Sequence, residues 1–95
     1  MRSQELLKAQ KQMEQLKQHI AELSCNGTVS DGLVTVTVSG HNRVTSVGIE
    51  PEAMELDRQD LGLLIAAATN LALDKLQQEL AKLRHDLATN VKAII

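Results

Sequence analysis

A short segment in the middle of the chain has the pattern of a small β-sheet between two helix-forming arms. Residues 26–51 carry several glycines, with β-branched residues filling the gaps between them. Valine alternates with threonine or serine over residues 34–39, as in a strand that buries one face. A sheet this small cannot bury both of its faces alone. The segment therefore predicts a partner chain as well as a sheet.

Three strands are expected in this segment, over residues 28–30, 33–39 and 43–50. The turn signals between them are Asp31-Gly32 and Gly40-His41-Asn42. Gly48 lies inside the last strand, where a glycine indicates a bulge or the close approach of another backbone. Pro51 ends the sheet, because proline has no N–H to offer a strand ladder.

The first arm, over residues 3–23, has an apolar residue at every third or fourth position. These residues are Leu6, Ala9, Met13, Leu16, Ile20 and Leu23. Such spacing is typical of a coiled-coil seam. Ser3 is a suitable N-cap. Asn26-Gly27 is expected to end the arm, since glycine favours the left-handed conformation past a helix end.

The second arm, over residues 58–90, changes character along its length. Asp57 is expected to cap it, and Asp60 lies in its first turn. From Leu61 to Leu73 it is apolar nearly all round, which favours packing on the sheet. A second heptad seam then follows, formed by Leu73, Leu76, Leu80, Leu83 and Leu87. Lysines at the outward positions of both seams form a stripe, which is most simply a solvated helix face.

These patterns predict a single α+β domain over residues 1–95, with a long helix, a three-stranded antiparallel sheet and a second long helix. The chain has no Phe, Tyr or Trp. Its core must therefore be modest, which makes a lone monomer less likely and favours a partner chain, with helical arms that project from the sheet. The absence of aromatic residues also removes the stacking platforms of single-stranded nucleic-acid binders. The expected dimer core consists of Val34, Val36, Val38, Val47, Ile49, Ile65 and Ala68.

Charge is unevenly distributed, although the formal net charge is only −2. Residues 1–23 carry four bases and three acids, residues 24–56 one base and four acids, and residues 57–95 five of each. The acid excess therefore lies in the middle of the chain. Because a strongly basic footprint is missing, overall charge by itself does not indicate nucleic-acid binding.

The remaining polar residues do not indicate catalysis. The three histidines are far apart in sequence and lack metal-ligand spacing, so neither a metal nor another cofactor is expected. Glu50, Glu52, Glu55 and Asp57 are interpreted as a solvated, helix-capping cluster. The single Cys25 fits a reducing cytosol and a buried structural thiol. A polar N-terminus and short apolar runs predict neither a signal peptide nor a membrane partner. No small-molecule substrate is expected, and the chain is predicted not to be an enzyme.

Four segments together resemble the YbaB/EbfC family of small bacterial nucleoid-associated proteins. They are Leu7–Met13, Asp31–Val36, Val47–Pro51 after Gly40, and Ala66–Ala72. The resemblance extends in order over residues 5–85. It implies a cytoplasmic homodimer whose paired arms bind double-stranded DNA with little sequence preference, affecting nucleoid organisation and gene expression. The contact candidates that it implies are Lys8, Lys11, Lys17, Lys75, Lys82 and Arg84.

A second hypothesis needs no DNA. Exposed heptad seams can recruit another helix, as coiled coils do. The docking surface would then be the seam from Leu73 to Leu87 together with Val91, Ile94 and Ile95. The chain would act as a protein-interaction module with little or no DNA binding.

Overall fold

The computed structural model describes the backbone of residues 3–94 and the side chains of residues 3–89. Helix α1 (Ser3–Glu22) is followed by strands β1 (Ser24–Val29), β2 (Val34–Ser39) and β3 (Val44–Ile49), and then by helix α2 (Arg58–Ile94). Two short 3-10 helices, η1 (Ser30–Gly32) and η2 (Pro51–Glu55), connect β1 to β2 and β3 to α2. This order confirms the predicted α+β fold.

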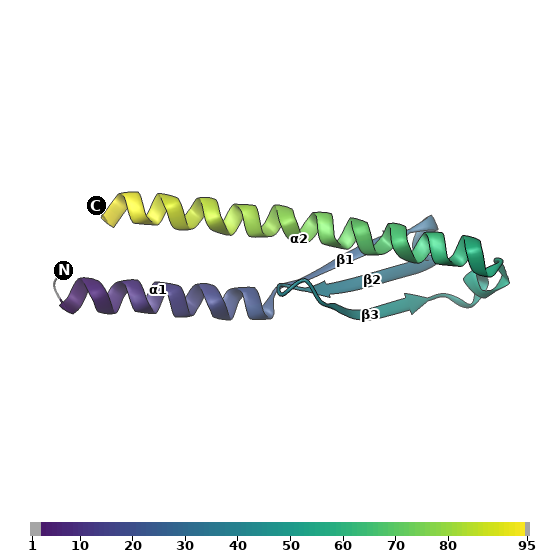
Figure 1. Cartoon of the computed structure of the whole chain (residues 1–95), viewed down its shortest axis with the longest axis horizontal. Helices are drawn as coiled ribbons and strands as arrows, with labels where there is room; N and C mark the ends of the chain where they lie inside the picture. The colour runs from purple at the N-terminus through teal and green to yellow at the C-terminus, as the bar shows by residue number, and fades with distance from the viewer. Residues whose placement is uncertain (1–2, 95) are drawn as a thin grey trace.

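The molecule is a rod of 63 × 18 × 17 Å. Helix α2 crosses the sheet and then continues past it beside α1, in the opposite direction, so that both termini lie at one end (Figure 1). We call α1 and the part of α2 from Lys75 onward the helical end. The three strands, η1, η2 and the first part of α2 form the sheet end.

The sheet is antiparallel, with the order β1-β2-β3. In the central strand, the three valines Val34, Val36 and Val38 are fully buried, while Thr35 and Thr37 between them face the other side and are partly exposed. This alternation was predicted from the sequence. The outer face is polar, and Thr37 Oγ1 donates a hydrogen bond to Asn26 Oδ1 on β1 at 2.8 Å.

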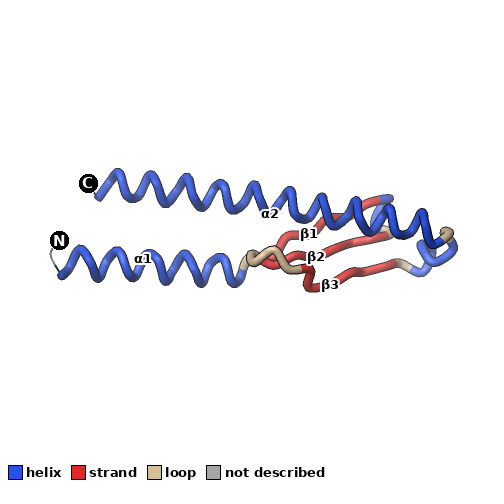
Figure 2. The backbone as a smooth tube through the Cα atoms, in the orientation of Figure 1, coloured by secondary structure: helices blue, strands red, loops and turns tan. Residues whose placement is uncertain are grey.

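Helix α2 covers the inner face of the sheet, packing mainly on β1 and β2 (Figure 2). Ala68, Ala72 and Leu76 are completely buried in this contact. Small residues allow the helix to lie close to β1. A side chain at Gly27 would overlap the backbone of Ala68 and Ala72. The prediction that Asn26-Gly27 ends the first helix was therefore wrong: α1 ends at Glu22, and both residues lie inside β1.

Strand β3 is bulged, but not at the glycine that was predicted to mark the bulge. The β2–β3 pairing passes from Thr37↔Ser46 to Val38↔Val44, which leaves Thr45 as the additional residue. A side chain at Gly48 would meet only the Thr35 carbonyl oxygen, at an ordinary contact distance of 3.7 Å. No other backbone approaches Gly48 closely within the described residues.

The predicted turns and cap are present. Gly32 has a φ of +92° in the connection between β1 and β2, where its lack of a side chain is required. The amide of Asn42 donates to the carbonyl oxygen of Ser39 at 3.0 Å in the connection between β2 and β3. Asp57 Oδ1 accepts a hydrogen bond of 2.8 Å from the amide of Asp60, which confirms Asp57 as the N-cap of α2.

Candidate nucleic-acid interface

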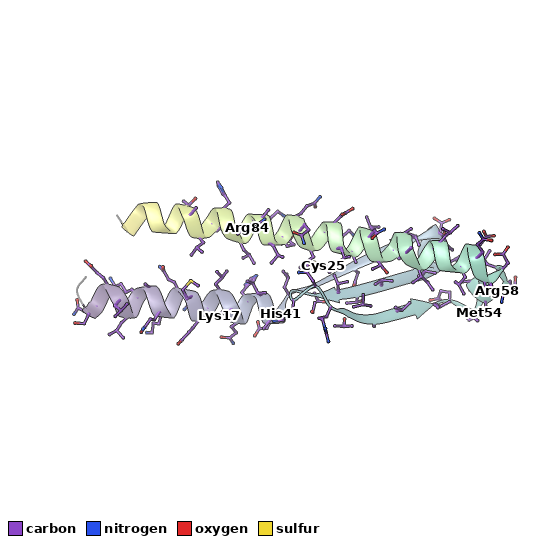
Figure 3. All side chains as sticks on the ribbon, viewed as in Figure 1. Lys17, Cys25, His41, Met54, Arg58 and Arg84 are labelled. Atoms are coloured by element: carbon purple, nitrogen blue, oxygen red, sulfur yellow. The ribbon has the colours of Figure 1, made fainter. Side chains whose placement is uncertain are left out.

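The basic residues singled out from the sequence all lie on the surface of the helical end. Lys8, Lys11 and Lys17 are exposed along α1, and Lys75, Lys82 and Arg84 are exposed along α2. Figure 3 shows Lys17 and Arg84 on the two different helices. The one ion pair found among residues 3–89 joins Lys82 Nζ to Glu79 Oε1 at 3.3 Å. Because both side chains are well exposed, this pair is weak and does not prevent Lys82 from meeting another anion.

The heptad seams explain why these bases point outward. Leu16 and Ile20 of α1 are partly buried, as are Leu83 and Leu87 of α2. A hollow of about 290 Å³ remains between the helices, lined by Leu16, Leu83 and Leu87. Near the start of α1, Leu6 and Met13 stay exposed. The two helices are thus only loosely packed on each other, and α1 has no buried residue. Among the residues proposed for the alternative docking surface, Val91, Ile94 and Ile95 lie outside the described side chains.

The turn between β2 and β3 packs against the end of α1. A side chain at Gly40 would overlap the carbonyl oxygen of Ile20 near the end of α1. The Gly40 amide donates to the carbonyl oxygen of Leu23 at 3.0 Å, and the Ser39 amide donates to that of Arg43 at 2.8 Å. His41 lies in this turn (Figure 3), Arg43 follows it, and both are exposed. The sequence interpretation did not include Arg43 in the site, although it is the single base between Lys17 and Arg58.

The two ends of the rod differ in charge. Residues 3–22 and 75–94, which form the helical end, carry seven bases and five acids, whereas residues 24–74 carry two bases and seven acids. Five of these seven acids are Asp31, Glu52, Glu55, Asp57 and Asp60, which lie in η1, η2 and the start of α2 and its N-cap. A polyanion is therefore attracted to the helical end and repelled by the sheet end.

The seven residues predicted for a dimer core fall into two groups. Val34, Val36, Val38 and Ala68 are buried within a single chain, and Ile65 is partly buried against them. Val47 and Ile49 pair with Val36 and Val34, so they share the inner face of the sheet. They are nevertheless 43% and 38% exposed, because α2 lies mainly over the other two strands. Val44 is also exposed, and these three β3 residues form what we call the β3 face.

Among the described residues, few features indicate a site of another kind. Within residues 3–94, no His, Cys, Asp and Glu side chains gather in a group of three that could hold a metal ion. Over the same residues no helix combines the length and apolar character needed to cross a bilayer. Cys25 is a buried free thiol on β1 (Figure 3), at a hollow that Leu23 and Lys75 also line.

Comparison with known proteins gives two kinds of similarity. The model of the YbaB/EbfC DNA-binding family matches residues 2–91. A nucleoid-associated protein of Legionella pneumophila is 36% identical over 74 residues, covering 78% of this chain and 66% of the relative. One from Saccharopolyspora erythraea is 41% identical over 76 residues, covering 76% and 66%. The chain thus spans just under two thirds of the length of these relatives.

A solved structure supports the fold independently. The crystal structure of an uncharacterized protein from Helicobacter pylori superimposes with a TM-score of 0.64 and covers 90% of this chain and 96% of that chain. Its sequence identity is 20%, so the likeness concerns the fold alone.

Proposed function

Because the chain belongs to the YbaB/EbfC DNA-binding family, we propose that it is a nucleoid-associated protein that binds double-stranded DNA as a homodimer. Residues 1–95 act as one domain, and the basic side chains of the helical end contact DNA phosphates. The names of the Legionella and Saccharopolyspora relatives, both nucleoid-associated proteins, support a place at the bacterial nucleoid.

The observation that carries this proposal is the segregation of charge along the rod. If the net charge of −2 were spread evenly over the surface, it would argue against DNA binding. The acids are concentrated at the sheet end, however, and the bases at the helical end. A duplex that approaches the helical end meets an excess of positive charge, while the acidic end faces away from it.

The contacts proposed are with the DNA backbone. Lys8, Lys11 and Lys17 on one helix, and Lys75, Lys82 and Arg84 on the other, are exposed and long enough to follow phosphates. Lysine meets a phosphate as a point charge and carries no base information there. Binding with little sequence preference follows from this arrangement. Lys82 exchanges its weak pair with Glu79 for a phosphate when DNA binds.

The turn between β2 and β3 adds a contact at the base of the helices. Its position is fixed by the Gly40 contact with Ile20 and by the Gly40–Leu23 hydrogen bond. Arg43 therefore meets a phosphate that reaches the junction between the helical end and the sheet. An arginine side chain can pair bidentately with phosphate oxygens, which favours such a contact.

The β3 face supports the homodimer. Val44, Val47 and Ile49 lie on the inner side of the sheet but have water where β1 and β2 have α2. A second copy that lays its own α2 across this face removes the three side chains from water. Full burial of such a side chain contributes about 1.5–3 kcal/mol. The helical ends of the two copies then form paired arms on a common core.

One observation favours the alternative, a protein-interaction module. Leu6 and Met13 occupy seam positions of α1 and are exposed. A partner helix would cover them and gain apolar burial without any DNA. The two functions can be told apart. Removal of the basic charges should abolish DNA binding, whereas substitution of the seam residues should abolish binding of a partner helix.

The test is the affinity for a short duplex, measured by fluorescence anisotropy at several salt concentrations. We expect log K to fall linearly with log salt. Replacing Lys8, Lys11, Lys75 and Lys82 by glutamine should weaken binding. The salt slope should decrease by about one for each phosphate that the variant no longer neutralises.

Arg58→Gln is the matched control, because it removes a base at the acidic end and should leave the affinity and the slope unchanged. Absence of binding by the unmodified protein at low salt contradicts the proposal. So does an equal loss of affinity in the Arg58 variant and the lysine variant.

A further inference from the structure

A hollow at the sheet end is lined by apolar side chains and one carboxylate, Asp60. The segments that form it carry further acids, and we call these acids together its rim. The hollow has a volume of about 350 Å³ and is lined by Ser30, Leu33, Leu56, Asp60, Leu63 and Leu64. We call it the end groove. These residues come from η1 and the residue after it, the residue after η2, and the first turns of α2. None of them belongs to the β3 face or to the proposed DNA contacts.

Two apolar side chains at this end of the rod are well exposed. Leu63 is 64% exposed, and Met54, in η2 near Leu56, is 65% exposed. Figure 3 places Met54 and Arg58 at the end of the rod opposite to the termini. Gathered apolar exposure of this kind marks a contact surface, whereas single exposed residues have no such meaning.

The carboxylates around the end groove are more numerous than the fold requires. Asp57 caps α2, and Asp60 favours the positive end of its dipole. No capping role of this kind accounts for Asp31, Glu52 and Glu55, which are all exposed. Against these five acids the sheet end offers one nearby base, Arg58. The rim is therefore strongly negative.

We propose that the end groove binds a polypeptide segment of a partner protein that presents aliphatic side chains flanked by lysine or arginine. The aliphatic side chains fill the hollow between Leu33, Leu56 and Leu63, and the flanking bases meet Asp31, Glu52 and Glu55. The volume lies near the lower limit of about 300 Å³ for ligand pockets, which suits a few side chains. The complementary charge selects the partner and steers it to the groove.

The same charge pattern excludes other occupants. Nucleic acid and anionic lipid surfaces carry negative charge and are repelled by the rim. A symmetric contact between two end grooves would place two acidic rims against each other. A basic segment satisfies both the apolar hollow and its rim. It binds at the end of the rod away from the proposed DNA contacts, so that one molecule can hold both.

The test uses the full chain without DNA and a dye-labelled synthetic peptide in which two leucines are flanked by lysines. Anisotropy should show saturable binding that weakens with salt. A peptide with serines in place of the leucines should bind at least about ten-fold more weakly, and one with glutamates in place of the lysines should not bind. Equal binding of the three peptides overturns the proposal.

Protein variants locate the site. Leu63→Gln and the pair Glu52→Gln and Glu55→Gln should each weaken the leucine–lysine peptide by at least about five-fold. The matched controls are Leu7→Gln, at a leucine of similar exposure on α1, and the pair Glu5→Gln and Glu14→Gln on the same helix. Retained binding in the groove variants, or equal weakening in the controls, overturns the assignment.

Sedimentation of the Leu63→Gln variant tests whether a second copy of the chain, and not a partner protein, occupies the end groove. Its oligomeric state should equal that of the unmodified protein. A shift to a smaller species assigns the end groove to contact between copies and overturns the proposal. A labelled peptide of residues 3–22 that binds more tightly than the leucine–lysine peptide does the same, because it assigns the groove to the helical end of a second copy.

Discussion

The sheet end and the helical end both carry aliphatic side chains in regular patterns, but they bury them very differently. Val34, Val36 and Val38 are completely enclosed between the sheet and α2, whereas α1 has no buried residue along its 20 residues. The free energy of folding is therefore concentrated at one end of the rod. The other end has its side chains available for contact, and this is where the bases lie.

The sharpest test of this comparison is Gly27→Val. The new side chain would overlap the backbone of Ala68 and Ala72, so α2 would have to move away from β1. We expect a loss of more than about 4 kcal/mol in the free energy of unfolding, which is most of the stability of a small domain. Urea unfolding followed by circular dichroism measures it. Gly48→Ala is the control and should change little, since only the Thr35 carbonyl lies near it.

The second test concerns the β3 face. Val47→Asp places a carboxylate where a second copy is proposed to pack. Burying it without a partner should cost about 2–5 kcal/mol of association free energy, so the variant should sediment as a folded monomer. Ser46→Asp, on the opposite face of the same strand, should remain a dimer. An unchanged dimer in the Val47 variant would place the interface elsewhere.

The third test compares the two ends directly. Val36→Ala removes two methyl groups from a fully buried position and should cost about 2 kcal/mol. Leu7→Ala removes more atoms from a side chain that is 60% exposed on α1, and it should change stability by less than about 0.5 kcal/mol. Thermal and urea unfolding of both variants give these values. Equal destabilisation would show that the helical end also supports the fold.

A fourth, smaller effect is expected at the junction turn. Arg43→Gln should weaken duplex binding only a few-fold and reduce the salt slope by about one, because it removes the charge that neutralises one phosphate. Its folding free energy should be unchanged, since the Arg43 side chain is exposed. A salt slope identical to that of the unmodified protein would remove the turn from the interface.

The smallest effect belongs to Gly62→Ala. This glycine lies inside α2, and a side chain there would have no neighbour within 4 Å. Alanine should therefore stabilise the helix by about 0.5–1 kcal/mol, through its better helix propensity alone. Thermal unfolding shows the change as a small rise in Tm. A decrease in stability would place Gly62 itself in the contact between α2 and the second copy.

Much of this fold could be predicted from local patterns. Period-two alternation identified the buried valines of β2, and heptad spacing placed Lys8 and Lys11 on the outside of α1. Long-range contacts could not be predicted in this way. Asn26-Gly27 has the local signature of a helix end, but Gly27 serves a contact with Ala68, which is remote in sequence. The bulge at Thr45 likewise depends on the pairing with β2 and not on Gly48.

In the candidate site, too, some features follow from local patterns and others depend on long-range contacts. The exposure of the helical bases follows from their seam register, so it could be predicted. The place of Arg43 depends on Gly40 packing against Ile20, which brings a turn of the sheet to the end of α1. The end groove combines residues from three separate segments, and no local pattern relates them. The exposure of the β3 face required knowing which strands α2 covers.

The central claim is that DNA meets the helical end while the sheet end holds the molecule together. An NMR titration of the isotope-labelled protein with a short duplex tests it most directly. Chemical-shift changes should be confined to α1, to α2 from Lys75 onward and to the turn that carries Arg43. Residues of η1, η2 and the first turns of α2 should not shift. Changes centred on the acidic end, or spread evenly over the rod, would contradict the account.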